Sequence, residues 1–217
     1  MSGWNEDGFS AFGTFQKQLQ GLIMARELLL IIAAYLLGSI PTGLLLAKAA
    51  GVDIRSSGSG NIGATNVYRT LGRSVGILTL VGDCLKGVVP VVAATYLGMS
   101  DSWVAAVGLA AFLGHVYTVF LGFKGGKGVA TALGVFLAVS PAAVGGALLI
   151  FVEVVWKWRY ISLGSIAAAL AMPGMVAVFD SRPPVVIMAV IIALLVVWKH
   201  RENIKRLQEG TESKFKA

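Results

Sequence analysis

Long apolar segments dominate this chain. The first, residues 28–47, holds 20 consecutive uncharged residues, and the others cover residues 75–97, 103–123, 129–155, 161–179 and 185–198. A helix crosses a bilayer with about 20 predominantly apolar residues. The sequence therefore predicts an all-α, polytopic integral membrane protein.

The composition agrees with a membrane protein and excludes an ordinary soluble enzyme. The 217 residues are 56% hydrophobic and 13% charged, whereas soluble domains hold roughly 45–50% apolar and about 25% charged residues. The formal net charge of +7 does not require a nucleic-acid partner, because membrane proteins concentrate Lys and Arg in cytoplasmic loops. We expect membrane lipid, and no nucleic acid, as a partner.

The fourth apolar segment decides the number of membrane spans. Its 27 residues would form one helix of roughly 40 Å, against a hydrocarbon core of about 30 Å. Two short helices hinged at Ser140-Pro141 would place fourteen Lys and Arg residues on one side, against Arg182 alone in the loops opposite. Since cytoplasmic loops are the basic ones, we predict seven transmembrane helices, the fourth and fifth short, with the N-terminus outside and the C-terminus cytoplasmic.

Residues 1–24 are mixed in composition, rich in glycine and without periodicity. We interpret them as an N-terminal extension or a cloning remnant, and residues 25–217 as a single membrane domain. Within the first apolar segment, Pro41 is expected to kink the helix, which a membrane protein tolerates where neighbours bond the freed carbonyl.

A polar segment, Asp53–Arg69, follows the first apolar one. Residues 58–63 match G-x-G-x-x-G, but that dinucleotide fingerprint needs a preceding strand and a crossover helix. Glycines nevertheless allow backbone N–H groups to converge on an anion, and an arginine can hold a phosphate with two N–H groups at once. The alternative is a flexible polar loop. The candidate phosphate-binding residues here are Ser59, Asn61, Thr65, Asn66 and Arg69.

A second glycine cluster, Gly122–Thr131, lies at the start of the fourth predicted helix, on the same side of the membrane. It is not a Walker A loop, because Lys127 is followed by Gly128 instead of Ser or Thr. Two lysines and close-approach glycines at a helix N-terminus suit a phosphate, although they could also form an anchor at the interface. The candidates are Lys124, Gly125, Gly126, Lys127, Gly128 and Thr131.

Ionisable residues inside membrane spans are costly and therefore informative. Asp83 and Lys86 are three residues apart, share a helix face and are expected to form an ion pair, with direct substrate contact as the alternative. His115 lies two turns before the second glycine cluster and is a candidate catalytic residue. A metal site is not expected, because the only other histidine is His200 and no carboxylate lies at ligand spacing from His115.

The basic tail after Trp198 is typical of a helix that binds anionic lipid. That interpretation explains the tail's lysines and arginines but not Asn203, which we take as a candidate catalytic residue together with Lys127. Ser162 and Ser165, at the start of the segment 161–179, complete the candidate phosphate-binding set.

Together these motifs resemble the bacterial acyl-phosphate:glycerol-3-phosphate acyltransferase family. The resemblance extends from about Leu28 to Glu212 and rests on Gly38–Gly43, Gly58–Asn66, Asp83–Gly87, Gly114-His115, Lys124–Thr131 and His200–Leu207. It implies a membrane acyltransferase that moves a fatty acyl group from acyl phosphate to the 1-hydroxyl of glycerol 3-phosphate. The products would be lysophosphatidic acid and phosphate, in the first step of bacterial phospholipid synthesis. It also implies seven helices in the bacterial cytoplasmic (inner) membrane and a site at the cytoplasmic face; we expect a monomer without a cofactor.

The expected chemistry follows from the donor. Glycerolipid acyltransferases that use thioesters carry His-x4-Asp, in which the carboxylate orients a histidine base, and this dyad is absent after both His115 and His200. An acyl phosphate is a mixed anhydride with a good leaving group. We therefore expect direct attack by the glycerol hydroxyl, with the donor phosphate assisting proton removal. Asn203 would orient the hydroxyl, Lys127 and Arg69 would stabilise phosphate charge, and His115 is the competing base.

Two other classes of protein remain as alternatives. A membrane transporter of a phosphorylated solute would suit broken helices and midplane charges, but the candidate residues gather on one side and no inverted repeat is visible. An alcohol phosphotransferase would need several metal-binding aspartates on one helix, and only Asp83 lies within the predicted spans.

Overall fold

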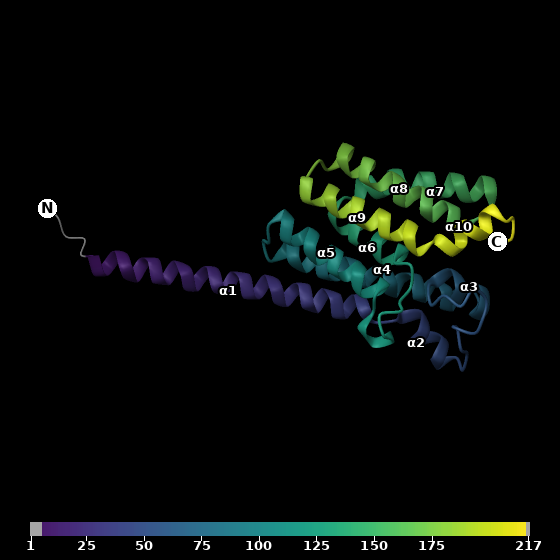
Figure 1. The fold of residues 1–217 in the computed structure, drawn as a ribbon, viewed down its shortest axis with the longest axis horizontal. Helices are drawn as coiled ribbons and strands as arrows, with labels where there is room; N and C mark the ends of the chain where they lie inside the picture. The colour runs from purple at the N-terminus through teal and green to yellow at the C-terminus, as the bar shows by residue number, and fades with distance from the viewer. Residues whose placement is uncertain (1–5, 216–217) are drawn as a thin grey trace.

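The structure, a computed structural model, describes residues 6–215 and the side chains of residues 13–215. Every regular element in this part of the chain is a helix (Figure 1). The all-α prediction is confirmed, and each apolar segment is helical over most of its length. In chain order the elements are α1 (Glu6–Ser39), α2 (Thr42–Ala49), α3 (Ala64–Leu71), α4 (Arg73–Tyr96), α5 (Asp101–Val116), the 3-10 helix η1 (Val119–Leu121), α6 (Val129–Val139), α7 (Pro141–Trp158), α8 (Ile161–Phe179), α9 (Pro183–Lys199) and α10 (Arg201–Gln208).

The fourth apolar segment divides at Ser140, as expected. Helix α7 begins with Pro141, where a proline costs nothing because the first helical N–H has no intrahelical partner. Helix α6 has only 11 residues, but α7 has 18 and continues through Trp156, Lys157 and Trp158. The fifth helix is therefore longer than predicted, because it continues past the apolar segment that ends at Val155.

Among the described residues, five helical segments are long and apolar enough to cross a bilayer, and six if α9 and α10, bent by 55°, are counted together. The five are α1 joined to α2, α4, α5 with η1, α7 and α8. Helix α6 is apolar but too short by this criterion. Of the seven predicted spans, five are matched by helical segments of sufficient length, α9 passes only together with α10, and α6 is too short.

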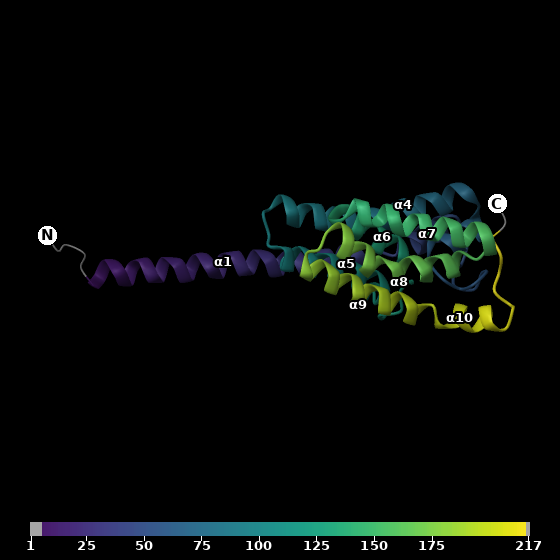
Figure 2. The ribbon, with the colours of Figure 1, turned by 90° about the horizontal axis from the view of Figure 1, so that it is seen from above.

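Helix α1 extends much further toward the N-terminus than the sequence predicts. Its 34 residues give a length of about 51 Å, and the side chains of residues 13–26 are all exposed. Figures 1 and 2 show this part projecting beyond the other helices. The segment set aside as an extension is therefore helical from Glu6 onward, since it holds no proline and each glycine weakens a helix by only about 1 kcal/mol. Residues 1–5 lie outside the described part of the chain.

A break at Ile40-Pro41 separates α1 from α2, where the sequence predicts only a kink. Carbonyls at the break are bonded by other helices: Lys86 Nζ donates to Ile40 O at 2.9 Å, and Thr118 Oγ1 donates to Ser39 O at 2.6 Å. Irregular backbone is tolerated at membrane depth where protein groups satisfy it in this way. The break consequently ties α1 to α4 and to the segment after α5.

Glycines allow two pairs of helices to pack with their backbones in contact. A Cβ at Gly38 of α1 would lie 2.1 Å from Ala111 O of α5, and a Cβ at Gly134 of α6 would lie 2.0 Å from Cys84 O of α4. Small residues at such crossings let membrane helices approach closely. The contact between α4 and α6 is the one that brings Thr131 beside Asp83.

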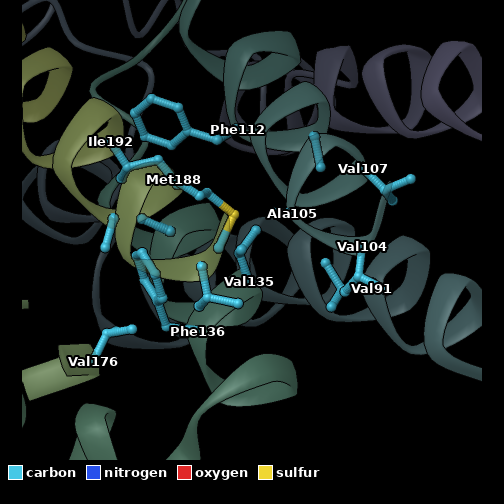
Figure 3. Packing of buried hydrophobic residues seen from close by; sticks show 14 of the residues in the cluster. Val91, Val104, Ala105, Val107, Phe112, Val135, Phe136, Val176, Met188 and Ile192 are labelled. Carbon is cyan, nitrogen blue, oxygen red and sulfur yellow. The ribbon is translucent and has the colours of Figure 1, made fainter. Parts of the chain in front are cut away.

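The apolar core lies between α4, α5, α6 and α9 (Figure 3). Phe112 and Phe136 are its largest fully buried side chains, and Met188 lies between them. Figures 1 and 2 show α3, α10 and the C-terminal tail at the end of the bundle away from the N-terminus. This rigid core therefore supports a cluster of short elements at one end.

Candidate active site

Asn66, in the first turn of α3, organises the serine–glycine loop, which comprises residues 50–63. Its Oδ1 accepts a hydrogen bond from Ser59 N at 2.9 Å, and its Nδ2 donates to Asn61 O at 2.8 Å and Ser57 O at 3.0 Å. Gly58 adopts a φ of 58°, and a Cβ there would lie 2.3 Å from Asn66 Oδ1. The Asn66 amide is thus fully engaged, so in this structure it shapes the loop and does not face a ligand.

The serine–glycine loop forms one wall of an open polar pocket of about 330 Å³. The opposite wall comes from the glycine–lysine loop, residues 122–128, and from α10. Arg55 Nη2 donates to Lys124 O at 3.3 Å and joins the two loops. Four predicted phosphate-binding residues, from two loops far apart in the chain, meet here. The pocket is lined by Arg55, Ser59, Gly60, Asn61, Ile62, Lys124, Gly125 and Glu202.

Lys127 and Asn203, two of the predicted catalytic residues, are in direct contact. Lys127 Nζ donates a hydrogen bond to Asn203 Oδ1. Asn203 lies on the buried face of α10, and its Nδ2 donates to Glu212 Oε1 at 2.7 Å. The amide orientation is therefore fixed, with its oxygen toward the lysine and its nitrogen toward a carboxylate.

Glu212 is a central residue of the site that the sequence analysis missed. Besides Asn203, it accepts hydrogen bonds from Ser162 Oγ and Arg206 Nε, both at 2.7 Å. Burial opposes ionisation of the carboxyl, but the three donors outweigh it and lower the Glu212 pKa below its usual value. Glu212 is therefore an anion at neutral pH that links α8, α10 and the C-terminal tail.

The C-terminal tail reaches the site by crossing two other elements. Arg69 Nη2 of α3 donates to Ser213 O at 3.2 Å. The tail also bonds Arg159, the residue that follows α7. Phe215 N donates to Arg159 O at 2.6 Å, and Arg159 Nε donates to Phe215 O at 3.1 Å. The Phe215 ring also lies 5.9 Å from that of Tyr68. Arg69, predicted to hold phosphate, therefore contacts the tail and is not among the residues that line the polar pocket.

Lys127 has an unusual electrostatic environment. Burial lowers the pKa of its ammonium from 10.5 to about 8, and the nearby Glu212 carboxylate opposes this only in part. A bound phosphate would favour the charged form again, because opposite charges a few ångströms apart stabilise one another. Lys127 is therefore suited to binding an anionic substrate reversibly.

His115, the third predicted catalytic residue, lies inside the bundle beneath the glycine–lysine loop. Its Nδ1 is 3.0 Å from Thr131 Oγ1 and 3.8 Å from Asp83 Oδ1. Asp83 and Lys86 form an ion pair of 2.8 Å. All four side chains are at most 5% exposed. Folding thus places beside His115 a carboxylate that the spacing in the sequence does not reveal, and it places Thr131 in this buried cluster instead of in the polar pocket.

The remaining candidates lie around these groups and do not line the polar pocket. Gly126 is buried against the His115 ring, and Gly128, with a φ of 79°, begins α6. Ser165 donates to a carbonyl of its own helix, and Thr65 is half-buried in the first turn of α3.

Three charged site residues were missed by sequence reasoning: Arg55, Glu202 and Glu212. The first two line the polar pocket. A signal for Glu212 was available, since it follows Gly210, whose φ of 69° turns the chain back toward α10. After this turn the Glu212 carboxylate lies against Arg206 of α10.

Comparisons with known proteins place this geometry in a family. Residues 28–210 match the family described as glycerol-3-phosphate acyltransferase. A glycerol-3-phosphate acyltransferase from Geobacter sulfurreducens is 70% identical over 194 residues, which are 89% of this chain and 100% of the relative. The relative of the same name from Aquifex aeolicus is 49% identical over 192 residues, which are 88% of this chain and 100% of the relative.

Two crystal structures of PlsY (YgiH), an integral membrane glycerol 3-phosphate acyltransferase, share the fold. They are its glycerol 3-phosphate form and its lysophosphatidic acid form, with TM-scores of 0.85 and 0.82. Each is 46% identical to this chain, and the match covers 88% of this chain and 96% of the other. The family match includes Ser59, Lys127 and Asn203. The chain belongs to the glycerol-3-phosphate acyltransferase family.

Proposed function

We propose that the protein transfers a fatty acyl group from an acyl phosphate to the 1-hydroxyl of glycerol 3-phosphate, giving lysophosphatidic acid and phosphate. Family membership and the two ligand forms of PlsY support the acceptor and the product. The observation that carries the proposal is the meeting of the two glycine loops with Lys127 and Asn203 at one end of an apolar bundle. Such a site suits two phosphorylated substrates, one of which also carries a lipid chain.

The phosphate of glycerol 3-phosphate binds in the polar pocket. Ser59, Asn61 and the Gly125 backbone offer neutral hydrogen-bonding groups, and Lys124 supplies a positive charge. Lys127 exchanges its hydrogen bond to Asn203 for one to the phosphate, which relieves the cost of burying its ammonium. Binding then frees the Asn203 carbonyl oxygen for the substrate hydroxyl.

The transfer itself is a direct displacement. The glycerol 1-oxygen attacks the acyl carbonyl carbon, the bond from that carbon to the phosphate oxygen breaks, and the departing phosphate takes the hydroxyl proton. Asn203 Oδ1 accepts a hydrogen bond from the attacking hydroxyl and orients it without titrating. Lys127 also stabilises the charge that develops on the departing phosphate of the donor. Glu212 keeps the Asn203 amide in the required orientation through its 2.7 Å hydrogen bond.

An alternative assignment makes His115 the general base. Its burial beneath the glycine–lysine loop, with Nδ1 directed to Thr131 and Asp83, favours the substrate-assisted route. The pH profile of His115→Gln distinguishes the two, because a histidine base would account for the acid limb of the parent profile and that limb would disappear with the imidazole.

The protein acts as a monomer in the bacterial cytoplasmic membrane, with seven spans, the N-terminus outside and the site at the cytoplasmic face. The five long apolar helical segments, the bent α9–α10 pair and the shorter apolar α6 support the seven spans, and the basic loops and tail on the side that holds the site support the orientation. Helix α6, too short to cross alone, starts at the site loops. It would complete its span with the glycine–lysine loop and by local thinning of the bilayer.

The donor is tested with detergent-purified protein. We expect rapid turnover of palmitoyl phosphate with glycerol 3-phosphate, and none with palmitoyl-CoA at equal concentration, because the mechanism uses an oxygen of the donor phosphate to take the hydroxyl proton, and a thioester carries no phosphate on its acyl carbon. Comparable rates with both donors would contradict the acyl-phosphate assignment while leaving the acyltransferase activity in place.

A further inference from the structure

The buried cluster of Asp83, Lys86, His115 and Thr131 has no part in the displacement just described. Its four residues come from α4, α5 and α6, and one of them, His115, lies directly against the glycine–lysine loop. Burying an ion pair gives little net stability, so a pair that merely held helices together could be replaced by apolar packing. The geometry around His115 indicates a more specific use.

Hydrogen-bond directions fix the state of the His115 ring. The Thr131 hydroxyl donates its single hydrogen to Asp83 O at 2.9 Å. Toward His115 Nδ1, at 3.0 Å, Thr131 Oγ1 can therefore only accept, which makes Nδ1 the protonated nitrogen. The ring is held in one plane and one tautomer, and its Nε2 edge points away from the cluster.

That Nε2 edge supports the glycine–lysine loop. A Cβ at Gly126 would lie 2.3 Å from His115 Nε2, so the loop backbone rests against the ring with no room for a side chain. The loop is also bonded to the end of α5: Gly126 N donates to His115 O, and Gly125 N donates to Val116 O, both at 3.2 Å. Lys127 is the next residue along the chain, so the ring and these two bonds set where its ammonium lies.

We propose that the Asp83–Lys86–His115–Thr131 cluster is a positioning device that holds the glycine–lysine loop and thereby places the Lys127 ammonium for glycerol 3-phosphate. In this role His115 is a positioning residue and not a catalytic one. The inference rests on the proposed function, because only then is the loop a grip for substrate phosphate. The Asp83–Lys86 pair fixes this part of α4. Thr131 is hydrogen-bonded both to Asp83 O and to the His115 ring, so it sets the ring relative to α4. The ring in turn supports the glycine–lysine loop.

Thr131 allows a test that leaves the imidazole in place. Thr131→Val removes only the hydroxyl at constant shape, and Thr131→Ser is the matched control that keeps it. We expect Thr131→Val to raise the KM for glycerol 3-phosphate about tenfold, the effect of one buried hydrogen bond, with a smaller fall in kcat, because Lys127 also stabilises charge during the transfer. Thr131→Ser should restore most of the parent KM. The melting temperature of each purified variant is measured to separate this effect from loss of folding.

The contact between ring and loop is tested by a double-mutant cycle with Gly126→Ala and His115→Ser. Each single variant should raise the KM for glycerol 3-phosphate. In the His115→Ser background, Gly126→Ala should have almost no further effect, because the ring against which its methyl would press is gone. All these variants should keep the acid limb of the parent pH profile.

Two results would overturn the positioning role. One is a Thr131→Val enzyme with the parent KM; the other is full additivity of Gly126→Ala and His115→Ser. Failure of the proposed function is a separate outcome, since it would show as a parent protein that does not acylate glycerol 3-phosphate at all.

Discussion

Lys127 is the residue on which substrate recognition and chemistry both depend. It bonds Asn203 and lies close enough to Glu212 and Arg206 to feel their charges. Its burial lowers the pKa to about 8, so the lysine is only partly charged under mildly alkaline conditions. This gives the site a pH dependence that can be assigned to one side chain.

We expect kcat/KM for glycerol 3-phosphate to fall as the pH rises above about 8, because the free enzyme then loses the Lys127 ammonium. Lys127→Arg should be slower but should lack this alkaline limb, since a guanidinium stays protonated. Lys124→Arg is the matched control and should retain it. The measurement is steady-state kinetics from pH 6 to 10. An alkaline limb that persists in Lys127→Arg would contradict the assignment of this limb to Lys127.

Glu212 gives a second prediction at this scale. Glu212→Gln keeps the size of the side chain, but the new amide can turn either its oxygen or its nitrogen toward Asn203. The orientation of the Asn203 amide is then no longer fixed. Hydrogen bonds to a charged group contribute about 1.5–3 kcal/mol, and we expect kcat to fall roughly 10- to 100-fold. Glu209→Gln, at an exposed residue of the same tail, is the control. Equal activity of the two variants would show that Glu212 does not act on Asn203.

At the scale of helices, the break between α1 and α2 depends on a charge supplied by α4. Lys86 satisfies both the Ile40 carbonyl and the Asp83 carboxylate, at 2.9 and 2.8 Å. The sequence predicts the proline distortion and the pairing of Asp83 with Lys86 separately. It does not show that one lysine serves both, because that requires α1 and α4 to be adjacent.

Lys86→Met should therefore destabilise the protein strongly. It leaves a buried carboxylate unpaired, which costs about 3–5 kcal/mol, and for a chain of this size the melting temperature should drop on the order of 10 °C. Lys48→Met, at an exposed position of α2, should melt like the parent. Fluorescence-detected unfolding in detergent measures both, and equal melting temperatures would refute the role given to Lys86.

For the whole molecule, the sequence predicts what depends on local pattern and misses what depends on contacts between distant segments. Apolar length and the Ser140-Pro141 hinge predict the helices, and the glycine loops predict the region of the site. The position of Thr131 beside Asp83, and of Glu212 beside Asn203, follows from the crossing of α4 with α6 and the return of the tail after Gly210. The helical N-terminal segment was missed because its glycines obscure any periodicity.

The proposed topology makes a prediction for the whole chain in its membrane. A cysteine placed at Ser59 and one placed at Thr211 should both resist a membrane-impermeant thiol reagent added outside intact cells, and both should react after permeabilisation. Cys84→Ser serves as the background, since Cys84 is the single native cysteine. Labelling of Thr211→Cys but not Ser59→Cys from outside would require an odd number of crossings between them and would rule out seven spans.

The central claim is that the Lys127–Asn203 site joins an acyl group to glycerol 3-phosphate. The most direct measurement follows purified protein in detergent with palmitoyl phosphate and radiolabelled glycerol 3-phosphate, and quantifies lysophosphatidic acid and released phosphate together. We predict equal amounts of the two products from the parent, and loss of nearly all turnover in Lys127→Ala and Asn203→Ala proteins that purify normally. Parent protein that forms no lysophosphatidic acid but carries glycerol 3-phosphate into liposomes, or an Asn203→Ala variant with the parent rate, would contradict the account.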